Sequence, residues 1–314
     1  MATPSSKSSL SSQDLSQETA TIASDEIAAI SSDTSQNTGN FHGSVRSGPS
    51  VLLREFSMVN RKVSSLHEHV SPIYTMRERE AFGINEEYGG ITGTLRPSCF
   101  ERLARFLRGE IIKGARVFVG SGSADVPPVL SAAYQLEKTS VFCDIGSGTG
   151  RPAFYFACLP IRASVGFDVD PMQVLNSLHA QRLLHRVEAT SSLQRAPTCF
   201  FHENVLTLTS LGPTTHAFAF LGYPAIVKAT TLLVAKSSVR VFIPVVLHFG
   251  ELRHTGILDP DPVDDVEDPI VLLPTMTMPG GSSYSGMVIP LTPTRRRRVL
   301  ERLGDTSTNK ILLK

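Results

Sequence analysis

The chain has 314 residues, 41% of them hydrophobic, which is enough for one large folded domain with appended segments. Its formal net charge of +1 excludes a general attraction to nucleic acid, so any such contact must come from a local cluster of charge. The four cysteines are widely spaced and form no Cys-x-x-Cys pair, which favours reduced thiols over a zinc site. Since the sequence shows no signal peptide and no run of ~20 apolar residues, we expect no membrane span and a location in the nucleus or cytosol.

The chain divides by composition into a polar tail and a folded region. Residues 1–50 contain 14 serines and few large apolar side chains, so we expect them to be disordered. A helical lead-in is expected over 51–84 and a single folded domain over 85–303, followed by a short tail. Within that domain, the acidic and proline-rich stretch 257–269 is expected to be a solvated loop.

A glycine-rich stretch precedes the first helix of the predicted domain. Residues 88–94 contain three glycines and lead directly into a helix predicted over 97–107. Ser98 and Glu101 have the spacing of a capping box at the start of that helix. The glycines are compatible with a loop that faces a ligand and equally with a tight turn.

Strands and helices then alternate along the chain. A short strand over 116–119 and a second glycine loop over 120–125 are expected to lead into a helix over 129–136. Beyond it we predict strands at 140–145, 163–168, 198–202, 216–221 and 238–247, with helices at 151–158, 171–186 and 224–235. This order is typical of βαβ units, and it predicts an α/β fold with a mostly parallel sheet and helices on both faces.

The C-terminal part has a different pattern. The segments 270–278 and 283–291 are joined by Pro279-Gly280-Gly281, which predicts an antiparallel hairpin at the edge of the sheet. A last helix is expected over 293–303.

The stretch from Asp144 to Gly150 carries the strongest chemical signal. An apolar strand ends in Asp144 and is followed by glycines at three alternate positions, 146, 148 and 150, with Ser147 between the first two. The nicotinamide fingerprint Gly-x-Gly-x-x-Gly would require glycine at position 151, where this chain has arginine. Alternate glycines after an acid are instead typical of class I enzymes that bind S-adenosylmethionine, so we predict this cofactor.

Polar residues at the ends of the next two strands complete the predicted cofactor site. Asp168 is the candidate ligand for the ribose hydroxyls, since Asp170 directly precedes Pro171 and fits the N-cap of a helix. After the following strand, Asn204 is the candidate hydrogen-bond partner of the adenine amine, with Glu203 as the alternative.

Several segments in order resemble the non-SET histone lysine methyltransferases, the disruptor-of-telomeric-silencing family. The segments are Tyr88-Gly89-Gly90, Asp144 to Gly150, Gly166-Phe167-Asp168, Phe218-Ala219-Phe220 and the hairpin from Leu273-Pro274 to Tyr284-Ser285-Gly286. The resemblance implies a seven-stranded class I methyltransferase and a nuclear chromatin regulator that methylates a lysine of a nucleosomal histone. It further implies that Tyr88 lines the cofactor pocket and that Tyr284 walls the channel for the substrate lysine.

Two positions depart from the family pattern. Gly90 replaces the acid of the family's Tyr-Gly-Glu loop, and no asparagine lies between Val205 and Pro290. We therefore expect His216 or Tyr223 to rebuild the site of methyl transfer. The alternatives are a methyltransferase acting on RNA, another protein or a small molecule, and a relative that binds the cofactor without turnover.

A run of four arginines, Arg295, Arg296, Arg297 and Arg298, opens the last predicted helix. Such a run can contact DNA phosphates or the acidic face of a histone assembly, or act as a nuclear import signal. The alternative is a solvated helix surface balanced by the acidic loop. The histidines, including His67, His69 and His248, show no spacing that predicts a metal site.

Overall fold

A computed structural model of the chain describes residues 50–70, 95–119, 122–124, 128–187, 195–208, 210–223, 225–236, 238–260 and 267–304. All of them belong to one compact unit, Pro49–Lys314. The predicted N-terminal tail, the loop with Tyr88 and Gly90, and the middle of the acidic loop lie outside the described residues. Within the described residues no helix has the length and apolar character needed to cross a membrane.

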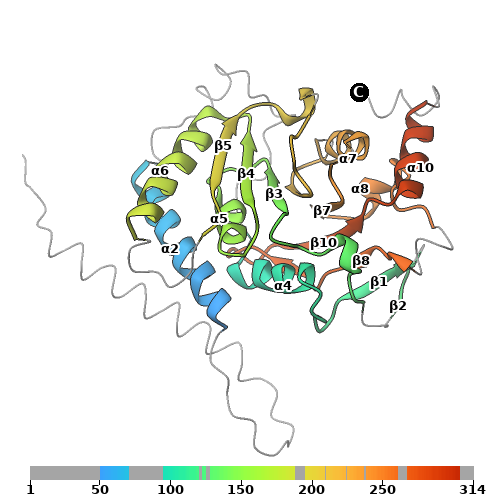
Figure 1. The fold of residues 1–314 in the computed structure, drawn as a ribbon, viewed down its shortest axis with the longest axis horizontal. Coiled ribbons are helices and arrows are strands. Elements are labelled where there is room, and N and C mark those ends of the chain that lie inside the picture. Colours follow the sequence, from blue (N-terminus) through green and yellow to red (C-terminus); the bar gives the residue numbers. More distant parts are fainter. Residues whose placement is uncertain are drawn as a thin grey trace, which may run out of the picture. The chain divides into compact units, whose positions relative to one another are not determined.

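The sheet is built on five parallel strands (Figure 1). These are β3 (Val141–Ile145), β4 (Ala163–Asp168), β5 (Thr198–His202), β6 (His216–Phe220) and β7 (Val241–Val246). Antiparallel strands extend it: β10 (Ser283–Pro290), β8 (Val271–Leu272), β9 (Met276–Thr277), β1 (Arg116–Val119) and β2 (Gly122–Ala124). The spatial order is β2-β1-β8-β10-β7-β6-β3-β4-β5, with β9 also paired to β10. The predicted α/β fold with a C-terminal antiparallel hairpin is confirmed.

The register of the central strands brings their carboxyl ends to one edge of the sheet. Ile145 at the end of β3 lies beside Phe167 of β4 and Ala219 of β6. Asp168 at the end of β4 lies beside His202 at the end of β5. The loops that leave these strands therefore converge, and this edge is where ligands bind in open α/β sheets.

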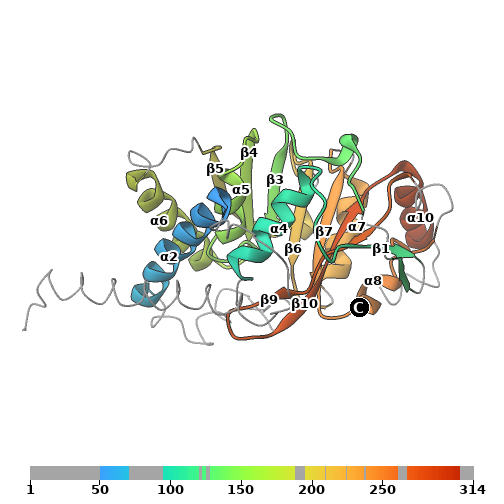
Figure 2. The ribbon, with the colours of Figure 1, turned by 90° about the horizontal axis from the view of Figure 1, so that it is seen from below.

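Helices cover both faces of the sheet, as alternate strand residues turn to opposite sides. On the face of Phe142 lie α2 (Val51–Val70), α4 (Pro97–Leu107), α5 (Arg151–Ala157) and α6 (Pro171–Val187). On the face of Cys143 lie α7 (Ala225–Ala235), α8 (Gly250–Arg253) and α10 (Pro293–Gly304). Figures 1 and 2 show α2 and α6 side by side next to β5, and α4 across the middle of the sheet.

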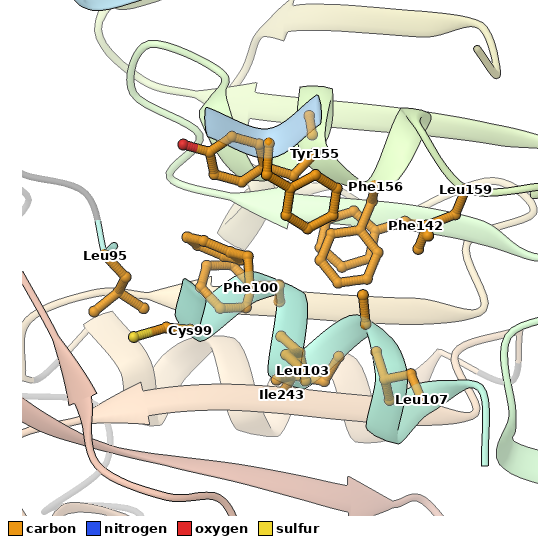
Figure 3. Packing of buried hydrophobic residues seen from close by; sticks show 14 of the residues in the cluster. Leu95, Cys99, Phe100, Leu103, Leu107, Phe142, Tyr155, Phe156, Leu159 and Ile243 are labelled. Atoms are coloured by element: carbon orange, nitrogen blue, oxygen red, sulfur yellow. The ribbon is translucent and has the colours of Figure 1, made fainter. Parts of the chain in front are cut away.

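Aromatic rings fill the space between α4, α5 and the sheet (Figure 3). The ring of Phe100 on α4 lies 5.0 Å from that of Tyr155 on α5 and 5.5 Å from that of Phe218 on β6. Phe142 and Phe156 stack with their ring centroids 3.7 Å apart. All five rings are almost fully buried, so they contribute a large part of the hydrophobic stabilisation of this face.

Three local predictions are wrong. Only a short 3-10 turn, η2 (Ala132–Tyr134), forms where a helix was predicted over 129–136, and extended conformations at Ser131 and Gln135 bound it on both sides. The start of α4 has no side-chain cap, and Glu101 instead accepts a hydrogen bond of 3.1 Å from Ser50. The hairpin strand β10 does not lie at the sheet edge, because β8, β1 and β2 continue the sheet beyond it.

Candidate functional site

The loop from Gly146 to Gly150 joins β3 to α5 in a conformation that requires its glycines. The three glycines have φ angles of +72°, +51° and +79°, which residues with a side chain rarely adopt. The backbone N–H groups of Gly146 and Ser147 both donate to the carbonyl of Phe167, at 2.9 Å each. The loop is thereby fastened to the end of β4.

The surroundings of the three glycines differ. A Cβ atom on Gly146 would lie 2.5 Å from Leu221, and one on Gly150 would lie 2.6 Å from the ring of Phe200. A Cβ atom on Gly148 would have no described atom within 4 Å. The first and last glycines thus allow close packing, whereas the middle one borders open space at the carboxyl edge of the sheet.

Asp168 connects the end of β4 to the glycine loop. Its Oδ2 accepts a hydrogen bond of 2.7 Å from the backbone N–H of Gly148, and its Oδ1 accepts one of 2.8 Å from that of Asp170. Asp170 itself accepts from the backbone N–H of Met172 at 2.9 Å, which confirms it as the N-cap of α6. A carboxylate oxygen can accept more than one hydrogen bond, so Asp168 is also suited to hydroxyl donors from a ligand.

Asp144 is a buried acid with an unsatisfied oxygen. Asp144 is 1% exposed, and its Oδ2 has no hydrogen-bond partner among the described residues. Burial, and secondarily the charge of Asp168, hold the pKa of this carboxyl well above its usual range, although a hydrogen bond from the Ala153 backbone acts in the opposite direction. A cationic donor at Oδ2 would satisfy this oxygen and stabilise the ionised form.

The remaining predicted cofactor residues lie around the same edge, apart from Tyr88, which is outside the described residues. Ser147 is buried, and its hydroxyl has no hydrogen-bond partner among the described residues. Asn204 follows β5 and accepts a hydrogen bond of 3.0 Å from the backbone N–H of Leu206, as the N-cap of η4 (Val205–Thr207). This bond uses its carbonyl oxygen only, while the neighbouring Glu203 is exposed.

Two of the three predicted methyl-transfer residues lie near the carboxyl end of β6. Tyr223 follows this strand and is 54% exposed. Tyr284 on β10 packs edge to face against Phe220, the last residue of β6, with ring centroids 4.8 Å apart. The end of β6 therefore carries aromatic groups on the strand next to the glycine loop.

His216 does not belong to this group. It lies at the amino end of β6, beside Phe142, about 13 Å along the strand from the loops at a rise of ~3.3 Å per residue. Its buried ring contacts Thr215 Oγ1 at 2.9 Å and the Tyr134 carbonyl oxygen at 3.0 Å. Burial lowers the pKa of His216 to about 4, so the ring is neutral at pH 7. The prediction that His216 rebuilds the site of methyl transfer is wrong; the residue has a structural role.

The arginine run at the start of α10 is mostly turned inward. Arg295 is fully buried and donates to the carbonyl oxygens of Asp268 at 2.7 Å and Pro290 at 2.9 Å. Arg296 and Arg298 also donate to backbone carbonyls, those of Val234, Lys236, Val239, Asp259 and Pro260. Three of the four arginines that the sequence offered as possible DNA contacts thus hold the protein's own main chain, and Arg297 alone is exposed.

Two residues beside the loop were not among the predicted site residues. Leu221 packs under Gly146, and no sequence signal distinguishes it from an ordinary apolar residue. Arg151, directly after the last glycine, donates to Thr149 Oγ1 at 3.1 Å and to Ser64 Oγ of α2 at 3.0 Å. Burial lowers the pKa of Arg151. The sequence feature that could have marked Arg151 as a site residue is its position directly after Gly150, where the loop joins α5.

No cluster of three or more histidine, cysteine, aspartate or glutamate side chains suited to a metal ion occurs in the described part of the chain. No protein-family model and no curated protein sequence matches the chain.

Solved structures of methyltransferases show weak similarity. An rRNA methylase from Streptococcus thermophilus is 14% identical with a TM-score of 0.35, the match covering 50% of this chain and 90% of that one. A putative RNA methyltransferase from Pyrococcus horikoshii is 11% identical with a TM-score of 0.38, covering 68% and 96%. Magnesium protoporphyrin IX methyltransferase from Synechocystis, solved with bound S-adenosylmethionine, is 15% identical with a TM-score of 0.32, covering 48% and 68%. The strand order of the sheet, with antiparallel β10 between β7 and β8, is that of the class I methyltransferase fold predicted from the sequence.

Proposed function

We propose that the chain is a methyltransferase that uses S-adenosylmethionine as its methyl donor. The observation that carries the proposal is the buried, unsatisfied oxygen of Asp144 beside the glycine loop. In this assignment Asp144 accepts a hydrogen bond from the amino group of the methionine moiety, and Asp168 accepts hydrogen bonds from the ribose hydroxyls. Asn204, whose carbonyl oxygen accepts from Leu206, donates from its amide nitrogen to a ring nitrogen of the adenine instead of accepting from the adenine amine. When bound, the cofactor supplies a methyl group already activated on a sulfonium.

The charges at the site favour this cofactor over a dinucleotide. The charge of Asp168 beside the loop would repel a diphosphate. Asp144, whose pKa is raised by burial and by Asp168, is stabilised in its ionised form by a cationic partner and not by an anion. Pro152, the second residue of α5, also removes one of the backbone N–H groups that a diphosphate would use. S-adenosylmethionine has a positively charged sulfonium and an ammonium group, and acidic side chains at the site attract these positive charges.

Transfer of an activated methyl group depends mainly on alignment and exclusion of water. Leu221 and Phe220, at the end of β6, provide apolar surface next to the loop. Tyr223 and Tyr284 would then position the acceptor against the methyl group.

RNA is the first candidate acceptor, and exposed Tyr223 is the feature that favours it. An aromatic ring that is 54% exposed beside the site can stack on an unpaired base, a contact worth about 1–3 kcal/mol. The inward-turned arginines remove the main support for a contact with nucleosomal DNA.

A nucleosomal histone lysine is the second candidate, and the pair of Tyr284 with Phe220 favours it. Aromatic faces stabilise the cationic states of an amine, and an edge-to-face pair gives a rigid wall for a narrow channel. On this alternative the protein would act in the nucleus.

Two measurements test the cofactor and the acceptor separately. Calorimetry with S-adenosylmethionine should show binding, and Asp168→Asn should weaken it about 10- to 100-fold through the loss of charge-assisted hydrogen bonds. Glu301→Gln, a change of an exposed acid on α10, is the matched control and should leave the affinity unchanged. Transfer of a labelled methyl group should then be compared on RNA, nucleosomes and free histones. Absence of cofactor binding by the unaltered protein would refute the proposed function, whereas label on nucleosomes alone would exclude RNA as the acceptor.

A further inference from the structure

Arg151 is a half-buried cation, and no acidic partner of its guanidinium occurs among the described residues. Its two hydrogen-bond partners are hydroxyl groups, Thr149 Oγ1 and Ser64 Oγ. Its Nε is buried and has no hydrogen-bond partner among the described residues. Among the described residues this guanidinium meets only neutral groups, and a partly buried charge without a counter-charge is unfavourable. Such a guanidinium can bind an anionic group of a ligand.

The position of this guanidinium is set from two sides. Thr149 belongs to the glycine loop, and Ser64 belongs to α2. One turn earlier on α2, Asn60 Oδ1 accepts a hydrogen bond of 3.0 Å from the hydroxyl of Tyr155, which lies one turn after Arg151 on α5. Two parallel links between α2 and α5 therefore hold Arg151 against the loop.

We propose that Arg151 binds the carboxylate of the methionine moiety of S-adenosylmethionine. This inference rests on the proposed function. The methionine moiety is zwitterionic, and the glycine loop has a buried acid with an unsatisfied oxygen, Asp144, before it and a half-buried cation, Arg151, after it. In this assignment Asp144 binds the ammonium and Arg151 binds the carboxylate, and a Cβ atom on Gly148, in the loop between these two residues, would meet no described atom within 4 Å. Arg151 is a binding residue, and Thr149 and Ser64 orient it.

Decarboxylated S-adenosylmethionine isolates this contact, because it lacks only the carboxylate. The unaltered protein should bind the complete cofactor more tightly than the decarboxylated one. Arg151→Met should weaken binding of the complete cofactor about 10- to 150-fold, as expected for charge-assisted hydrogen bonds, and change binding of the decarboxylated one by less than about threefold. Ser64→Ala should give a smaller loss of about two- to fivefold, again for the complete cofactor only.

The controls separate a binding role from a structural one. Arg162→Met, a change of an exposed arginine before β4, should affect neither ligand. Arg151→Lys should retain part of the preference for the carboxylate. Equal losses for both ligands in Arg151→Met, or equal affinities of the unaltered protein for the two, would overturn the assignment of Arg151 while leaving the proposed function in place. Should the unaltered protein bind neither ligand, the proposed function fails, and the inference fails with it.

Discussion

The buried ring of His216 makes the stability of the fold depend on pH. Its pKa is about 4 in the folded protein and about 6.5 in an unfolded chain, so protonation favours the unfolded state. The stabilisation is complete above pH 6.5 and is lost as the pH falls from 6.5 towards 4. At 1.36 kcal/mol per pH unit, the whole window corresponds to about 3 kcal/mol, and the step from pH 7.5 to 5.0 to about 2 kcal/mol.

The measurement compares the unaltered protein with His216→Gln in urea denaturation at pH 7.5 and 5.0. Other titrating groups act in both proteins, so the difference between the two isolates the imidazole. On acidification from pH 7.5 to 5.0, the free energy of unfolding should fall by about 2 kcal/mol more in the unaltered protein than in the variant. At pH 7.5 the variant should be less stable and should bind S-adenosylmethionine with unchanged affinity. An identical pH dependence of the two proteins, or a loss of cofactor binding without a loss of stability, would refute the structural role of His216.

Three further substitutions test the packing described above by thermal or urea denaturation. Gly150→Ala should destabilise the protein by about 2–4 kcal/mol through strain and overlap with a neighbouring ring, whereas Gly212→Ala, with φ +58° and open space, should show the strain alone, about 1 kcal/mol. Arg295→Met should cost about 3 kcal/mol because it leaves a buried carbonyl, that of Pro290, and a partly buried one, that of Asp268, without their donor, and the same change at exposed Arg297 should cost less than ~0.5 kcal/mol. Phe100→Ala should cost about 3–5 kcal/mol through a cavity between α4, α5 and β6. Equal effects within either pair, or a stable Phe100 variant, would contradict these contacts.

The loop and the strand ends were predictable from the sequence because their signals are local. The alternate glycines after Asp144 indicate a loop with positive φ angles. The proline after Asp170 marks the start of a helix that Asp170 caps, which leaves Asp168 as the acid at the strand end. Each inference needs only a few neighbouring residues. The same holds for the parallel order of the strands, which follows from their alternation with helices.

The roles of His216 and of the arginine run were not predictable in this way, since they depend on partners far along the chain. The ring of His216 meets the carbonyl of Tyr134, and Arg295 meets that of Asp268, whose positions only the folded sheet determines. The sequence alone does not distinguish an arginine that donates to main-chain carbonyls from an arginine that faces solvent. For the same reason the sequence does not indicate that Arg151 donates to Ser64, which lies 87 residues earlier in the chain.

The attachment of α2 has a consequence for work with fragments of this chain. Phe56, Val59 and Val63 are fully or almost fully buried, and the ring of Phe56 stacks on Tyr155 at 4.9 Å. A fragment that begins at residue 85 would lack α2. It would expose the apolar surface that α2 covers, and it would lack the Ser64 hydroxyl that accepts a hydrogen bond from Arg151. Expression from Pro49 onward preserves both, so a binding assay on the shorter fragment would measure a site with one of its supports removed.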